Sequence, residues 1–405
     1  MKAPRSRKKR RLPYLLVVGL VVAYVVWATL RPLPNLQPAT PNAQLQLHTT
    51  SGHVAWPSSS QAAVGVVQTD ILEVNGNQVP VPIASTAKII TVLTVLEKKP
   101  LQLGQDGPTL TLTDQDVALY NNYVAQDGSV VPVQAGEQLS ERQALEAIML
   151  PSANNMADSL AIWAFGSLGA YSQAANDYLA RHGLTATHVG SDASGLSPTT
   201  TSTAHDLVLL GKLALANPVL TAIAGQPSAT DIPVAGTVDN VNILLGSNGI
   251  IGLKTGNSDQ AGGVFVAAAK AAVNGKTPVV ITAVVGAPDL SSAMRDSVTL
   301  VRSAQNNFQT VNVIRAGAIV GRYRQPWSGS LAATVAQDLN VTTWAGSTIT
   351  TSVSLKPHSP TATSGQIVGS LRTAPSVFMD PTSVPVKIQS ATSSPSILWR
   401  LAHPY

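Results

Sequence analysis

Residues 82–91 read PIASTAKIIT, a stretch in which Ser85 precedes Lys88 by three positions. From Ser85 to Lys99 apolar residues recur on nearly every side of a helix, and Pro100 ends it. A helix that is apolar all round is buried in a protein core. The sequence therefore predicts a central helix with Ser85 at its start. The Lys88 amine should reach the Ser85 hydroxyl, because residues three apart share a helix face.

This pair of side chains has the chemistry of a nucleophile and its base. A serine hydroxyl reacts poorly until a neighbouring base takes its proton. A lysine can be that base only when its neutral form is populated, and burial and a nearby second cation both lower a lysine pKa. Backbone N–H groups at a helix N-terminus can also bind an oxyanion. Ser85 is therefore the candidate nucleophile and Lys88 the candidate proton acceptor.

Two further short motifs follow in order, SAN beginning at Ser152 and KTG beginning at Lys254. Lys254 can supply the second cation, and Thr255 beside it offers a hydroxyl to a substrate carboxylate. Gly256 suits a strand edge that a substrate backbone approaches closely. Asn154 carries both a donor and an acceptor for a peptide bond. Each motif alone is a weak signal, but all three in this order, each on the expected element, favour a catalytic site.

Together these motifs resemble the serine D-Ala-D-Ala carboxypeptidases, the low-molecular-mass penicillin-binding proteins of peptidase family S11. The resemblance covers roughly residues 55–310. It implies a serine β-lactamase/DD-peptidase-like (transpeptidase-like) fold, peptidoglycan stem peptides as substrates, β-lactams as covalent inhibitors, and no metal or organic cofactor. The matching segments are PIASTAKIIT at 82–91, MLPSANN at 149–155, SDASGLSP at 191–198, STA at 202–204 and GLKTG at 252–256.

The resemblance also implies roles for individual residues. Ser85 would be acylated by the penultimate D-Ala carbonyl of a stem peptide, Lys88 would accept its proton, and terminal D-Ala would leave before hydrolysis. Ser152 and Lys254 would relay protons to the leaving amine and help to activate the deacylating water. The substrate would be held by Asn154 at its amide, by Thr255 and Gly256 of the KTG motif, by the backbone N–H groups of Ser85 and Asn257 as an oxyanion hole, and by Arg295 near the terminal carboxylate.

The order of predicted elements indicates an α+β fold rather than alternating βαβ units. Short strands come first, a group of helices follows, and three strands and one closing helix complete the catalytic domain. The remainder is rich in Val, Thr, Ser and Gly in short alternating strands, which predicts a small separate β-rich domain. The predicted boundaries are 55–309 for the catalytic domain, 310–396 for the β-rich domain and 397–405 for a C-terminal tail.

The N-terminal region has the features of a membrane anchor. Residues 1–11 carry seven positive charges and no acid, and residues 12–30 are uncharged and mostly apolar. A helix of that length spans about 28 Å, close to the hydrocarbon thickness of a bilayer. We expect a cytoplasmic basic tail, an uncleaved single-pass transmembrane helix at 12–30 in the cell membrane and a linker at 31–54, with the catalytic domain on the extracytoplasmic side. A cleaved signal peptide is the alternative.

Charge and composition argue against several other classes of protein. The formal net charge of +5 comes from the basic tail and leaves about −2 for the rest, so nucleic-acid binding is not indicated. The absence of cysteine excludes a disulfide scaffold and a thiol nucleophile. The seven histidines show no H-E-x-x-H or other tight ligand spacing, which argues against a metallo-carboxypeptidase and predicts no metal site.

Three alternative functions share parts of the pattern. A class A β-lactamase needs a glutamate between the second and third motifs, but residues 155–253 contain none, and Asp192 is the only carboxylate there within a loop-like motif. DD-endopeptidase action on cross-links would use the same residues and stays open. A non-catalytic cell-wall-binding protein is disfavoured because every polar motif position is retained.

Overall fold

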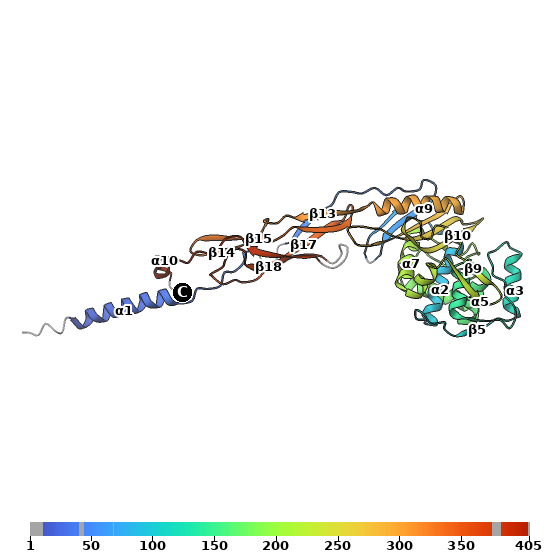
Figure 1. Cartoon of the computed structure of the whole chain (residues 1–405), viewed down its shortest axis with the longest axis horizontal. Helices are drawn as coiled ribbons and strands as arrows, with labels where there is room; N and C mark the ends of the chain where they lie inside the picture. The colour runs from blue at the N-terminus through green and yellow to red at the C-terminus, as the bar shows by residue number, and fades with distance from the viewer. Residues whose placement is uncertain (1–10, 40–43, 68, 375–381, 404–405) are drawn as a thin grey trace, which may run out of the picture. The chain divides into compact units, whose positions relative to one another are not determined.

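The computed structural model describes residues 11–39, 44–67, 69–374 and 382–403, so most of the predicted basic tail lies outside the described residues. The chain divides into two compact units. The central unit consists of residues 51–309, and the β-rich unit combines residues 1–50 with residues 310–405 (Figure 1). The mixed helix and strand content of the central unit and the strands of the second unit agree with the predicted α+β fold and β-rich region.

A five-stranded antiparallel sheet forms the base of the central unit, in the order β10-β11-β12-β2-β3. Its middle strands are buried along nearly their whole length rather than at alternate residues. This pattern arises because helix α9 packs against β11 and β12 while helix α7 packs against β12 and β2. The bounds are β2 Gln61–Val66, β3 Leu72–Asn75, β10 Ile250–Ser258, β11 Gly262–Lys270, β12 Val279–Ala287, α7 Ala204–Ala216 and α9 Leu290–Gln305.

Helix α2 (Lys88–Lys98) lies at the centre of the helical part of this unit, as its apolar pattern predicted. Every residue from Lys88 to Leu96 is buried, and α2 packs against α4, α5, α6 and α7. The helix expected to begin at Ser85 starts instead with a 3-10 turn, η2 (Ala84–Ala87). The other helices are α3 Asp114–Val124, α4 Glu141–Met149, α5 Asn154–Phe165, α6 Leu168–Arg181 and α8 Pro218–Ala224.

Short paired elements connect these helices to the sheet. The pair β4 and β7 matters most for the site, because it fixes the segment that leads directly into η2. The short elements are β4 Val81–Pro82, β5 Thr109–Thr111, β6 Gln138–Ser140, β7 Thr201–Ser202, β8 Ser228–Ile232, β9 Gly236–Asp239 and η3 Ser247–Gly249.

The β-rich unit contains a six-stranded sheet in the order β1-β17-β18-β19-β15-β14 and a two-stranded pair, β13-β16. Along β17 the burial alternates with a period of two, so one face packs on an apolar core and the other faces outward. The bounds are β1 Gln44–His48, β13 Phe308–Ile314, β14 Ile319–Gln325, β15 Gly329–Val335, β16 Leu339–Trp344, β17 Thr348–Leu355, β18 Ile367–Thr373 and β19 Ser383–Ile388.

The segment predicted as a linker, 31–54, is more ordered than its composition indicated. Its residues Gln44–His48 form β1, which pairs with β17 along its whole length. This edge strand forms its hydrogen bonds with a strand that lies 300 or more residues later in the chain. No local sequence pattern could therefore predict that it is a strand. The linker prediction was wrong in this part.

Helix α1 (Arg11–Leu30) covers the predicted transmembrane segment and is long and apolar enough to cross a membrane. A short C-terminal helix, α10 (Ile397–Ala402), packs against its end. The Arg400 guanidinium donates to the Thr29 and Arg31 carbonyl oxygens at 2.9 and 3.0 Å, satisfying backbone acceptors at and just beyond the end of α1. The predicted C-terminal tail therefore includes a short helix that packs against the end of α1.

Candidate active site

The candidate nucleophile and base lie next to each other at the junction of η2 and α2. The Ser85 Oγ and Lys88 Nζ atoms are 2.7 Å apart. The 3-10 geometry favours this contact, because side chains at positions i and i+3 of such a turn are eclipsed. The turn is held in place by Ala84, whose φ of 45° is unusual for a residue with a Cβ.

Two carbonyl oxygens complete the surroundings of the Lys88 amine. Lys88 Nζ donates to Asn154 Oδ1 at 2.7 Å and to the Ser194 backbone oxygen at 3.1 Å. Both oxygens can only accept a hydrogen bond. A neutral amine has two hydrogens and one lone pair, so these two acceptors take the hydrogens and leave the lone pair for the Ser85 hydroxyl. The geometry therefore suits proton transfer from Ser85 to Lys88.

The electrostatic surroundings also favour the neutral amine. The pKa of Lys88 is lowered well below its ordinary value, mainly by complete burial and next by the positive charge of Lys254. Asp192 and Asp158 act in the opposite direction. Burial alone lowers the pKa of Lys254 to about 7. The second cation predicted from the KTG motif is thus close enough to act on Lys88.

The KTG motif lies on β10, which runs directly against the turn that carries Ser85. A Cβ placed on Gly256 would be 3.1 Å from the Ser85 backbone nitrogen and 3.0 Å from the Ile83 carbonyl oxygen. A glycine is therefore needed here because two backbones approach each other closely. Thr255 on the same strand is buried. Lys254 Nζ donates to the Thr255 carbonyl oxygen at 3.2 Å.

The SAN motif joins α4 to α5. Ser152 is buried and has a φ of 67°, a left-handed conformation that turns the chain before α5 begins. Asn154 is the first residue of α5, and its backbone nitrogen donates to the Ser129 carbonyl oxygen at 2.7 Å. Asn154 is thus fixed at its backbone while its side chain contacts Lys88. No hydrogen bond of the Ser152 hydroxyl occurs with any residue that the structure describes.

A cavity of about 770 Å³ opens in front of the nucleophile. Three predicted site residues line it, Ser85, Asn154 and Asn257. The remaining lining comes mainly from residues 119–129, 191–198 and 258–260. Four other predicted residues, Lys88, Ser152, Lys254 and Thr255, are buried and do not line the cavity.

Arg295 is the one predicted site residue that stands apart from this group. It is exposed on α9, and its guanidinium donates to Ser292 Oγ at 2.9 Å. It does not line the cavity. Its role in binding a substrate carboxylate stays a prediction.

A network of polar side chains that line the same cavity was not predicted. The Tyr123 hydroxyl donates to Asp158 Oδ2 at 2.7 Å, and the Ala193 backbone nitrogen donates to Asp158 Oδ1 at 2.8 Å. Burial is the main cause that raises the pKa of Asp158 to about 6. Sequence spacing could have indicated Asp158, since it follows Asn154 by four positions and lies one turn along α5. Tyr123 had no such signal, because α3 was not predicted.

The loop at residues 191–198 is organised by Asp192. Its carboxylate accepts hydrogen bonds from Ser194 Oγ at 3.0 Å and from the Ser197 backbone nitrogen at 2.6 Å. Gly195 has a φ of 78°, and a Cβ there would collide with the Ala84 carbonyl oxygen. The loop therefore packs tightly on η2, which holds the Ser194 carbonyl against Lys88.

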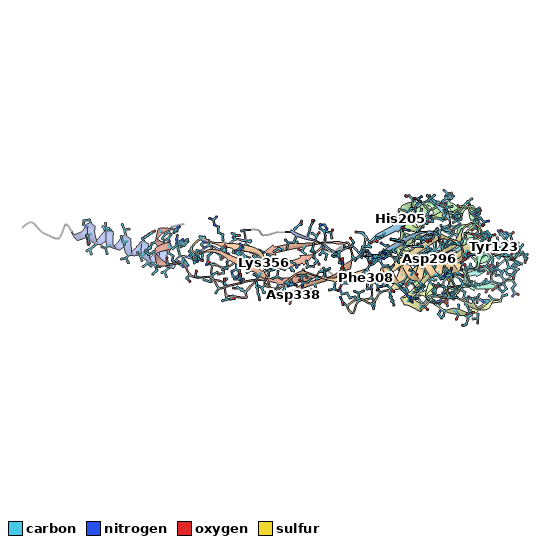
Figure 2. All side chains as sticks on the ribbon, turned by 90° about the horizontal axis from the view of Figure 1, so that it is seen from above. Tyr123, His205, Asp296, Phe308, Asp338 and Lys356 are labelled. Carbon is cyan, nitrogen blue, oxygen red and sulfur yellow. The ribbon has the colours of Figure 1, made fainter. Side chains whose placement is uncertain are left out.

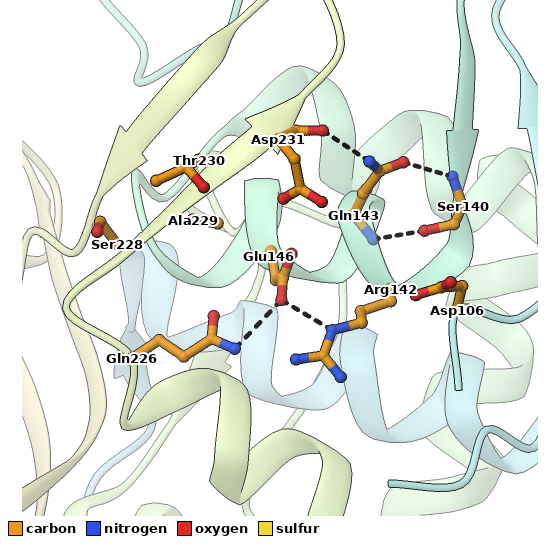
Figure 3. Close-up of a pocket in the computed structure, with 10 residues that line it drawn as sticks. All are labelled: Asp106, Ser140, Arg142, Gln143, Glu146, Gln226, Ser228, Ala229, Thr230 and Asp231. Carbon is orange, nitrogen blue, oxygen red and sulfur yellow. Dashed lines mark hydrogen bonds and ion pairs between the residues drawn. The ribbon is translucent and has the colours of Figure 1, made fainter. Parts of the chain in front are cut away.

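A second cavity of the central unit, about 350 Å³, contains none of the predicted site residues. Figure 3 shows an ion pair between two of its charged residues, Arg142 and Glu146. Glu146 Oε1 accepts from Arg142 Nε at 3.0 Å and from Gln226 Nε2 at 3.2 Å. Asp106 and Asp231 also line this cavity, so its lining carries more negative than positive charge. Within the described ranges, no group of three or more His, Asp or Glu side chains could hold a metal ion.

Comparison with solved structures finds proteins of similar fold, among them a penicillin-binding protein and a DD-transpeptidase. Penicillin-binding protein 5 from Haemophilus influenzae matches with a TM-score of 0.58 and 20% identity, covering 84% of this chain and 100% of that one. The Streptomyces K15 DD-transpeptidase matches with a TM-score of 0.54 and 22% identity, covering 62% of this chain and 98% of that one.

Sequence comparison then identifies the family. The model of the S11 peptidases, described as D-alanyl-D-alanine carboxypeptidase, matches residues 51–289, more than half of the chain. This chain belongs to peptidase family S11.

Curated relatives with the same description match this chain over part of their length. The D-alanyl-D-alanine carboxypeptidase DacB2 of Mycobacterium tuberculosis is 33% identical over 195 residues, which are 46% of this chain and 62% of that protein. DacD of Escherichia coli is 28% identical over 217 residues, 52% of this chain and 53% of that protein. The match thus spans between half and two thirds of the length of these relatives.

Proposed function

We propose that this chain is a serine D-alanyl-D-alanine carboxypeptidase, which removes the terminal D-Ala from peptidoglycan stem peptides and is acylated by β-lactams at the same serine. The observation that carries this proposal is the 2.7 Å contact between Ser85 Oγ and the buried Lys88 Nζ, whose hydrogens are directed to Asn154 and Ser194. Membership of family S11 and the carboxypeptidase description of the relatives support it.

Acylation begins with proton transfer from Ser85 to the Lys88 lone pair. The Ser85 Oγ atom bonds to the carbonyl carbon of the penultimate D-Ala, and the carbonyl oxygen becomes an oxyanion. The backbone N–H groups of Ser85 and Asn257 would stabilise this charge. When the tetrahedral intermediate collapses, the peptide C–N bond breaks. The departing D-Ala amine takes a proton supplied by Lys88 or Lys254 and relayed through Ser152.

Hydrolysis of the acyl-enzyme completes the cycle. A water molecule gives a proton to the same buried amines and attacks the ester carbonyl carbon. The ester C–O bond breaks, Ser85 regains a proton, and the shortened stem peptide leaves with a new carboxylate. Because the pKa of Lys254 is about 7, this side chain exists in both protonation states near neutral pH and can supply or take a proton.

Substrate binding would use the groups around the cavity. Asn154 can bind the substrate amide with the part of its side chain that does not contact Lys88. Thr255 and Gly256 on β10 would face the terminal residue, and Arg295 would attract the terminal carboxylate. The polar lining, including Tyr123, fits a peptide rather than an apolar ligand.

The helix α1 would anchor the enzyme as a single-pass span in the cell membrane. Its length and apolar composition support this role. The excess of positive charge before it would keep the N-terminus in the cytoplasm. The catalytic unit would then act on the extracytoplasmic side, where peptidoglycan is located.

Covalent labelling by a fluorescent penicillin tests the nucleophile. The full chain in detergent should be labelled, and Ser85→Ala should abolish labelling. Ser191→Ala is the matched control, because Ser191 lines the same cavity but has no role in the proposed chemistry. Labelling that persists in Ser85→Ala would refute the assignment.

Incubation with a stem peptide ending in D-Ala-D-Ala tests the reaction. Release of free D-Ala that depends on Ser85 supports the carboxypeptidase. Cleavage of a cross-linked dimer without release of terminal D-Ala would indicate an endopeptidase instead. Penicillin labelling with neither activity would indicate a wall-binding protein.

A further inference from the structure

The β-rich unit contains a cavity of about 590 Å³ whose lining is cationic. It lies at the end of β17 and the beginning of β18, far along the sequence from the residues of the catalytic cavity. The groups that line it include Lys356, His358 and Arg372, together with the hydroxyls of Ser354 and Ser370. None of its lining residues, all of them described, carries a carboxylate.

Strand register places Lys356 and Arg372 on opposite sides of a pair of serines. Ser354 is paired with Ser370 across β17 and β18, and Arg372 projects from the exposed positions of β18. Lys356 follows the end of β17, where its backbone nitrogen donates to the Val368 carbonyl oxygen at 2.9 Å. The pairing of β18 with β19 shifts register between Ile367 and Gly369. This register shift lies at the beginning of β18 and interrupts the regular face of the sheet beside the cavity.

His358 gives the cavity a fixed polar group. The residue is only 9% exposed, and its Nδ1 atom lies 2.8 Å from the Ser359 carbonyl oxygen. Because a carbonyl can only accept, Nδ1 carries a hydrogen and the ring is held in one orientation. In a neutral ring the other nitrogen can only accept a hydrogen bond, so we assign the contacts with an anion to the neighbouring lysine, arginine and serines.

No described carboxylate neutralises the charges of this cavity. Among the residues that the structure describes, neither Lys356 nor Arg372 forms an ion pair or a side-chain hydrogen bond. Residues 310–405 contain seven lysines and arginines but two acidic residues. The one described carboxylate among them, Asp338, accepts from the Ala316 backbone nitrogen (Lys356 and Asp338 are labelled in Figure 2). By contrast, residues 51–309 contain 11 basic and 19 acidic residues.

Chain connectivity fixes the cavity close to the outer end of α1. The backbone of His358 forms a two-way bridge with Leu36, with N–O distances of 2.8 and 3.0 Å. Leu36 follows Leu30, the last residue of α1, by six positions. Six extended residues cover no more than about 22 Å. If α1 spans the membrane as proposed above, this cavity is held near the membrane surface, where phosphate groups are abundant.

We propose that this cavity binds a phosphate group. An arginine fork, a lysine ammonium and two hydroxyls can together satisfy several oxygens of one phosphate, and a site without carboxylates does not repel it. The ligand could be a soluble phosphate ester or a phosphate carried by a lipid headgroup, and the same contacts would hold both.

The test is phosphate binding by the full chain in detergent, measured by calorimetric titration with inorganic phosphate and with glycerol 3-phosphate. The double variant Lys356→Gln, Arg372→Gln should bind at least about tenfold more weakly. The matched control is Arg322→Gln, Arg324→Gln, which removes the same charge from exposed positions of β14 in the same sheet but outside the cavity. It should bind within about twofold of the parent protein.

Equal losses in the two double variants would overturn the proposal, because they would indicate general electrostatic attraction rather than a site. Unchanged binding in the first variant would also overturn it. Repeating the titration in nanodiscs distinguishes the source. Weaker phosphate binding in discs with phosphatidylglycerol than in discs of phosphatidylcholine supports occupation by a lipid headgroup, and equal binding in both supports a soluble ester. Both double variants should still be labelled by penicillin, because the cavity is separate from Ser85. Loss of phosphate binding with labelling retained therefore concerns this proposal and not the proposed catalytic function.

Discussion

The substitution Gly256→Ala tests whether the position of β10 controls the nucleophile. The added Cβ would lie 3.0 Å from the Ile83 carbonyl oxygen, 3.1 Å from the Ser85 nitrogen and 3.2 Å from the Thr86 nitrogen. All three atoms belong to the backbone, so no flexible side chain can move aside. The turn that carries Ser85 must therefore shift by a few tenths of an ångström away from β10, or β10 must shift away from it.

The size of the effect follows from the role of the Ser85 N–H. Loss of one oxyanion-hole donor costs about 10²–10³ in rate, or roughly 3–4 kcal/mol of transition-state stabilisation. Because the donor is displaced rather than removed, we expect the acylation rate to fall by about 30- to 100-fold. The second-order rate constant for labelling with fluorescent penicillin measures this fall. The unfolding free energy, followed by urea denaturation, should change by no more than about 1–2 kcal/mol.

The matched control for this change is Gly169→Ala. Gly169 lies in α6, and its nearest potential contact, Ser167 Oγ, is 4.0 Å from the added Cβ. This variant should acylate like the parent protein. A folded Gly256→Ala protein that acylates within threefold of the parent rate would refute the reasoning, since it would mean that the two backbones separate without cost to the oxyanion hole.

Three further predictions concern titrating groups. Because the Asp158 charge raises the pKa of Lys88, Asp158→Asn should move the acidic limb of the plot of acylation rate against pH to lower pH. Penicillin-labelling rates from pH 5 to 9 measure this shift, and a limb that moves to higher pH would contradict it. Burial raises the pKa of Glu141 to about 7, so the folded state binds its proton more tightly and stability falls as the pH rises from about 4.5 to 7. Glu141→Gln should therefore stabilise the protein by about 1–2 kcal/mol at pH 8 and by less at pH 5, by urea denaturation at each pH; equal effects would argue against it. The pKa of Lys254 is lowered to about 7, so the unfolded chain binds more protons and stability should rise between pH 7 and 10. Lys254→Met should reduce that slope in thermal melts, and an unchanged slope would show that other groups cause it.

Much of the site could be predicted because its signals are local. The spacing of Ser85 and Lys88 places them on one face of a turn, and the apolar residues that follow require burial, which lowers the lysine pKa. Gly256 was predicted to let a substrate backbone approach closely, and the structure places the backbone of the turn that carries Ser85 against it. Likewise Asn154 was singled out for its side-chain donor and acceptor, and its Oδ1 atom accepts from Lys88.

Other parts of the site depend on contacts that no local pattern records. Tyr123 reaches Asp158 from a helix 35 residues away. The Ser194 carbonyl reaches Lys88 across 106 residues because Asp192 and Gly195 shape a loop against η2. A backbone carbonyl has no residue identity, so its role cannot be read from composition or spacing.

By itself, the sequence determined which side chains can react, which helix must be buried and which segment is apolar enough to cross a membrane. These properties depend on residue type and on spacing within one turn or strand. The tertiary structure alone decided that two carbonyl oxygens take the hydrogens of Lys88 and that β1 completes a sheet formed by the other end of the chain. It also decided that a residue of a cationic cavity pairs with Leu36, six positions after the end of α1. Each of these features depends on contacts between segments that are distant in the sequence. Such contacts are stabilised by packing and hydrogen bonds that only the folded chain can form.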